Sequence, residues 1–172
     1  MKRNIISAVL ILACFILLCT EFRALDFGGI VPNLLIILTA SFGFMRGETT
    51  GLIIGFVCGL LTDIFFADIL GFYALVYMYI GFVNGKFSRQ FYPEDIKMPM
   101  CLIIGSDFAY GFICYVFMFL LRGRFHLGYY MMHVIIPEIV YTLIVTIFLY
   151  PLILKINYRL ESKEKRSAKK FV

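Results

Sequence analysis

The sequence predicts an all-α integral membrane protein, a bundle of six transmembrane helices. Of its 172 residues, 62% are hydrophobic and only 16% are charged, and the mean hydropathy is +0.91. A soluble domain is nearer half apolar, so this chain has too few polar groups to cover its surface in water. Polar turns divide it into six apolar stretches, each about long enough to cross a bilayer as a helix.

The predicted helices follow these stretches in order. Turn residues and charges set their limits, at residues 4–20, 30–45, 49–66, 69–85, 98–121 and 128–154. The first follows Lys2 and Arg3, and because more membrane sequence follows it, we expect a retained helix and not a signal peptide. Pro32 is placed in the first turn of the second helix, where a missing N–H costs nothing. The helices make one domain, residues 1–155, followed by a basic cytoplasmic tail at 156–172.

Basic residues are distributed unevenly over the predicted turns. Most of the 16 Lys and Arg residues fall at the chain ends, at Arg46 and in the loop after the fourth helix, and six crossings put all of these on one side. Because basic residues favour the cytoplasmic side, we expect a multi-pass cell-membrane protein with both termini in the cytoplasm. The tail is expected to meet anionic lipid headgroups. Asp63 and Asp68 then lie at the outer interface, where we expect them to cap the turn between the third and fourth helices.

Glycines recur every four residues in the third predicted helix, at Gly51, Gly55 and Gly59, and the fourth repeats the spacing at Gly81 and Gly85. Small residues at this spacing let a second helix backbone approach closely. Two interpretations are open. The glycines pack helices of the same bundle together, or they form a groove for the transmembrane helix of a partner.

Acidic residues interrupt the last two apolar helices, at Asp107 and Glu138. A charge in hydrocarbon is costly, so each is expected to face the bundle interior, a wet cavity or a partner. Pro137 frees the backbone carbonyl of His133 from its helical bond, which predicts a polar cluster around His133 and Glu138. Structural hydrogen bonding and a proton or ion path are both open interpretations of these intramembrane polar residues.

Other classes of function find no support in the sequence. The five cysteines lie in apolar segments without metal-ligand spacing, so we expect packed free thiols and no metal site. No phosphate-binding loop, zinc-protease motif or nucleophile elbow is present, and we expect neither an enzyme nor a bound cofactor. The basic residues lie at a membrane face, so nucleic acid is not an expected partner.

The second to fourth predicted helices carry short motifs in a fixed order. A Leu-rich run opens on Pro32, a turn follows at Arg46 and Gly47, and the glycine-rich helix closes on Gly-Leu-Leu-Thr before Asp63, with Gly71 ahead of the next helix. In this order and spacing the sequence resembles the rod shape-determining protein MreD family. The chain departs from the family pattern in its last helix.

The resemblance implies a non-enzymatic membrane scaffold of the bacterial elongation machinery, which supports rod shape and lateral peptidoglycan synthesis. It implies direct binding to MreC. Through MreC, it implies one complex with MreB, the RodA glycosyltransferase and a penicillin-binding transpeptidase. It also implies a bundle similar to the S-components of energy-coupling-factor transporters.

Two other functions are open alternatives. One is an S-component-like subunit that binds a vitamin or similar small molecule from the outer side. Such subunits carry an Ala-x-x-x-Ala motif on the first helix, whereas Ala8 and Ala13 here are five residues apart, which favours the scaffold. The other alternative is a channel or proton-coupled carrier that uses Asp107 and Glu138.

Overall fold

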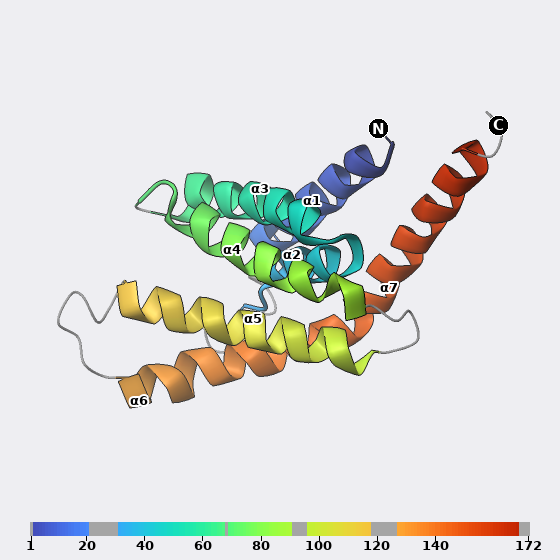
Figure 1. The fold of residues 1–172 in the computed structure, drawn as a ribbon. Helices are drawn as coiled ribbons and strands as arrows, with labels where there is room; N and C mark the ends of the chain where they lie inside the picture. The colour runs from blue at the N-terminus through green and yellow to red at the C-terminus, as the bar shows by residue number, and fades with distance from the viewer. Residues whose placement is uncertain (1, 21–30, 68, 91–95, 118–126, 169–172) are drawn as a thin grey trace.

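The computed structural model of the chain describes residues 2–20, 31–67, 69–90, 96–117 and 127–168 (Figure 1). These residues are almost entirely helical, which confirms the predicted all-α class. The elements are α1 (Lys2–Thr20), α2 (Leu34–Arg46), α3 (Glu48–Phe66), α4 (Phe72–Lys86), the 3-10 turn η1 (Phe87–Gln90), α5 (Lys97–Tyr115), α6 (Leu127–Tyr130), the π-helix η3 (Met131–Ile135) and α7 (Ile136–Ala168). Because α6, η3 and α7 are continuous, the described chain makes six helical rods.

Successive rods run back and forth between two ends of the bundle (Figure 1). The start of α1 and the end of α7 lie at one end, which we call the terminal end, together with the end of α2 and the start of α5. The end of α3 and the starts of α4 and α6 lie at the other end, which we call the far end. Asp68 and residues 118–121 of the predicted fifth helix lie outside the described residues.

Helix α2 is the centre of the bundle. Its residues from Leu34 to Phe44 are all buried, as expected of a helix that is apolar on every side. Side chains of α1, α3, α4, α5 and α7 complete the core around it. The expected start at residue 30 was wrong, because α2 begins at Leu34 and Asn33 caps it. Pro32 therefore lies before the helix and not in its first turn.

Three helices are long and apolar enough to cross a membrane, at Glu48–Phe66, Lys97–Tyr115 and Gly128–Ser162. Within the described residues, α1 and α2 supply shorter apolar helices. Large apolar side chains such as Ile64, Phe108 and Phe148 are exposed on the outside of the bundle. An outer surface of exposed apolar side chains is stable in contact with lipid.

The last rod changes its helical geometry near its start. In η3 the backbone N–H of Ile136 donates to the carbonyl of Met131, five residues earlier, and Pro137 follows directly. Proline has no N–H to continue the α-helical pattern, and a single π-turn is a common way to absorb such an interruption. The rod then continues without a break to Ala168, so the helix extends past residue 155 into the basic tail.

Candidate functional site

Arg46 joins three helices at the terminal end. Gly47 directly follows it with a φ of 93°, a backbone conformation that glycine adopts without strain, and α3 begins at Glu48. The Arg46 Nε donates to Asn157 Oδ1 over 2.7 Å, and its Nη1 donates to Ser7 Oγ over 2.7 Å. Since Ser7 lies on α1 and Asn157 on α7, one side chain from α2 ties both terminal helices to the centre of the bundle.

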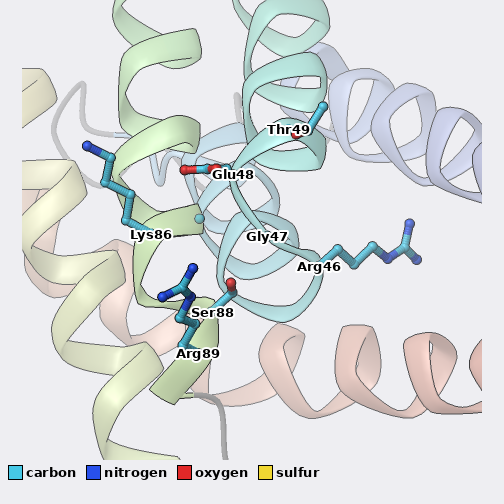
Figure 2. A pocket seen from close by; sticks show the side chains of 8 residues that line it. Arg46, Gly47, Glu48, Thr49, Lys86, Ser88 and Arg89 are labelled. Atoms are coloured by element: carbon cyan, nitrogen blue, oxygen red, sulfur yellow. The ribbon is translucent and has the colours of Figure 1, made fainter.

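A hollow of about 490 Å³ lies beside this turn, between the start of α3 and the end of α4. Figure 2 shows that the Arg46 side chain points away from the side chains of Lys86 and Arg89 on the other side of the hollow. Two bases close to the N–H groups of the first turn of α3 favour an anionic group, although Glu48 also lines the hollow. A second hollow of about 350 Å³ adjoins Arg46.

The glycine row of α3 lies against α4 of the same chain. A Cβ atom at Gly51 would collide with the Gly81 carbonyl oxygen, and one at Gly81 would collide with that of Gly51. Gly55 and Gly59 face the backbone of α4 around Tyr77 and Tyr73, and Gly85 faces Glu48. The five glycines therefore allow α3 and α4 to pack backbone against backbone. The face that they offer is occupied within this chain.

Asp63 caps the start of α4 at the far end. Its two carboxylate oxygens accept hydrogen bonds from the backbone N–H groups of Tyr73 and Ala74, both over 2.9 Å. The side chain is 1% exposed. Its charge is held at the positive end of the α4 dipole. Gly71 is the residue before α4 and has a φ of 99°, so it makes the left-handed turn that brings α4 back onto Asp63.

Asn33 is a polar junction that sequence reasoning missed. Its Oδ1 accepts from the backbone N–H of Ile36 over 3.2 Å and from the Tyr77 hydroxyl over 2.8 Å, while its own N–H donates to the Thr142 hydroxyl over 3.2 Å. It links α2, α4 and α7. The Pro-Asn pair ahead of an apolar run is a recognisable cap signal, but nothing in the sequence identifies the partners on α4 and α7.

The two intramembrane acids lie near each other, and the histidine does not join them. Glu138 lines a cavity near the far end, and the Asp107 carboxyl acts on it electrostatically. Asp107 is 2% exposed; neither of its oxygens forms a well-formed hydrogen bond in the described chain, and the Thr142 side chain is the described hydrogen-bond partner that acts on its carboxyl group. His133 is exposed and stacks on Tyr129 with ring centroids 4.2 Å apart. The predicted cluster of His133 with Glu138 was therefore wrong, because His133 lies on the exposed side of the rod while Glu138 lines the cavity.

The cavity beside Glu138 has a volume of about 200 Å³. Its described lining comes from all six rods and the segment before α2, and consists of Leu18, Val31, Pro32, Asn33, Leu35, Thr62, Phe66, Tyr73, Tyr77, Tyr110 and Glu138. Among these residues Glu138 is the only charged one. The described chain contains no group of three or more residues suited to hold a metal ion.

Comparison with known proteins identifies the family. The model of the rod shape-determining protein MreD family matches residues 2–159. The chain belongs to the MreD family. Membership makes it a rod shape-determining membrane protein, which agrees with its apolar helices. No curated protein and no solved structure matches this MreD-family chain.

Proposed function

We propose that this MreD-family protein is a non-enzymatic membrane scaffold of the bacterial elongation machinery, which binds MreC directly and supports rod shape and lateral peptidoglycan synthesis. The observation that carries the proposal is the family match over residues 2–159. The polar side chains of the bundle also support it, because Arg46, Asp63 and Asn33 connect helices to one another. MreB, RodA and a penicillin-binding transpeptidase are the further members of the proposed complex.

We further propose six membrane crossings with both termini in the cytoplasm. The basic residues Arg46, Lys86, Arg89 and Lys97 lie on elements that meet at the terminal end, and Asp63 lies at the far end. This distribution favours a cytoplasmic terminal end. A reporter fused after Val172 is expected to be active only in the cytoplasm, and activity only outside it would contradict the orientation.

The proposed partner surface lies on the outside of the bundle. Because the glycine row is covered by α4, a transmembrane helix of MreC would have to pack elsewhere. The exposed apolar side of α3, with Ile53, Phe56 and Leu60, is such a surface. Large-to-charged changes there are expected to weaken MreC binding without opening the α3–α4 interface.

Depletion of the protein in a rod-shaped host tests the proposal. We expect round cells after depletion, and co-purification of MreC with the tagged wild-type protein from detergent-solubilised membranes. Ile53→Lys is the test variant, and Ile144→Lys, which changes an exposed residue of α7, is the matched control. Rods of normal width after complete depletion, or no MreC in the purified fraction, would contradict the proposed function.

A second candidate function is a small-molecule-binding subunit similar to the S-components of energy-coupling-factor transporters. The cavity of about 200 Å³ near the far end favours it. This alternative predicts that a transporter ATPase module, and not MreC, co-purifies with the protein.

A further inference from the structure

The cavity beside Glu138 is an unusual place for an acid. Its other described lining residues are apolar or uncharged, and no described base pairs with the Glu138 carboxylate. Asp107 adds a second acid that acts on Glu138, and its own described partner is the uncharged side chain of Thr142. Ionised carboxyl groups in such surroundings call for a proton or a cation that offsets their charge.

Aromatic rings form one wall of the same cavity. The rings of Tyr73 and Tyr77 on α4 both contact the ring of Tyr110 on α5, with centroid separations of 6.0 Å and 5.3 Å. The faces of such rings attract cations, most strongly where water is excluded. Phe66 adds a further ring to the lining.

The size of the cavity and its polar lining groups indicate which class of cation would fit. At about 200 Å³ the cavity is smaller than a typical drug-sized pocket, and the Tyr77 hydroxyl and the Asn33 side-chain oxygen already bond to each other. The described residues hold no cluster of metal ligands. One carboxylate among ring faces suits a small organic cation better than a metal ion or an anion.

We propose that the cavity binds a small organic ammonium group, with Glu138 as its counter-ion and the rings of Tyr73, Tyr77 and Tyr110 as its wall. The ammonium group belongs to a lipid headgroup or to a free amine. Asp107 increases the negative potential behind Glu138. Binding at this site requires neither MreC nor a transport partner, so a failure of the amine-binding test would leave the proposed function untouched, and the reverse also holds.

Native mass spectrometry of the full chain in detergent micelles tests the site. Phosphatidylethanolamine, phosphatidylglycerol and free ethanolamine are added in separate arms. The wild-type protein is expected to retain an amine probe about tenfold more tightly than phosphatidylglycerol, and Glu138→Gln to lose that preference. Glu48→Gln changes an exposed acid at the terminal end and is expected to behave as wild type.

The two amine arms distinguish the sources of the ammonium group. Retention of phosphatidylethanolamine alone assigns the site to a lipid headgroup, and retention of ethanolamine assigns it to a free amine. Equal retention of amine probes by wild type and Glu138→Gln would overturn the proposal, as would the lack of any preference over phosphatidylglycerol. Either result would mean that Glu138 is not the counter-ion of a bound amine.

Variants of Tyr110 separate the ring wall from a general role in folding. Tyr110→Phe keeps the aromatic face, so amine retention is expected to stay within about twofold of wild type. Tyr110→Leu removes it and is expected to weaken retention several-fold. Equal retention by the two variants, measured on folded monodisperse protein, would overturn the aromatic part of the proposal.

Discussion

Asp63 and Asp107 are both buried aspartates in apolar helices, yet their surroundings differ. Asp63 is 1% exposed and both of its oxygens accept backbone N–H groups of α4. Asp107 is 2% exposed, no described backbone N–H bonds to its oxygens, and its described hydrogen-bond partner is the Thr142 side chain. The α3–α4 hairpin thus uses its acid to fix the fold. Asp107 on α5 forms no such cap.

Packing differs between the same two regions. In the α3–α4 hairpin, Gly51 and Gly81 are in backbone contact, and no side chain fits between them. On α5, a Cβ atom at Gly105 would meet nothing within 4 Å. Gly105 lies on the exposed side of α5, so backbone-to-backbone packing is a property of the hairpin and not of every glycine in the bundle.

The largest expected effect is that of Gly51→Val. The added side chain collides with backbone that cannot move without separating α3 from α4, which is worse than ordinary overpacking and should cost more than about 3 kcal/mol. We expect loss of the monodisperse peak in size-exclusion chromatography. Gly105→Val, with the same change in helix propensity, is expected to elute as wild type. Equal elution profiles of the two variants would contradict the difference in packing between Gly51 and Gly105.

Arg46→Ala should have the next largest effect. It removes two charge-assisted hydrogen bonds and leaves Ser7 and Asn157 without this partner, at an expected cost of about 3 kcal/mol in the free energy of unfolding. Arg89→Ala, which changes a base lining the nearby hollow, serves as the control and should stay within about 0.5 kcal/mol. The midpoint of thermal unfolding in detergent is the measurement. A smaller loss for Arg46→Ala than for Arg89→Ala would contradict the role given to Arg46.

Tyr77→Phe should have the smallest of these three effects. It removes the hydroxyl that donates to Asn33 Oδ1, and the expected cost is about 1 kcal/mol. Tyr79→Phe makes the same change at a side chain that is 64% exposed and should have no measurable effect on the unfolding midpoint. No difference between the two would mean that the Asn33 junction contributes nothing to stability.

The sequence predicted the features that depend on neighbouring residues. The apolar stretches, the turn at Arg46 and Gly47 and the position of Asp63 at the end of α3 all follow from local pattern. The start of α2 was missed because Asn33, one residue after Pro32, supplies the cap. Local signals place a helix end only to within a few residues.

Other features depend on contacts between distant segments, which a single sequence does not reveal. A helix that is apolar on every side is compatible with lipid or with a protein core, so the central position of α2 was not predictable. The cavity joins Tyr77, Tyr110 and Glu138 from three helices. Periodicity placed Glu138 and His133 on one helix but did not show that His133 points outward.

A comparison of two acid-to-amide changes tests the account most directly. Asp63→Asn replaces an accepting oxygen with an NH₂ group, so it should lose a bond to the α4 backbone and lower the free energy of unfolding by about 1–3 kcal/mol. Asp107→Asn loses no bond to the backbone, keeps a side-chain oxygen that Thr142 can still reach, and removes a buried acid. In detergent without amine lipids, its unfolding midpoint should equal or exceed that of wild type. An equal loss of stability in both variants would contradict the distinction between Asp63, which caps α4, and Asp107, which caps no helix.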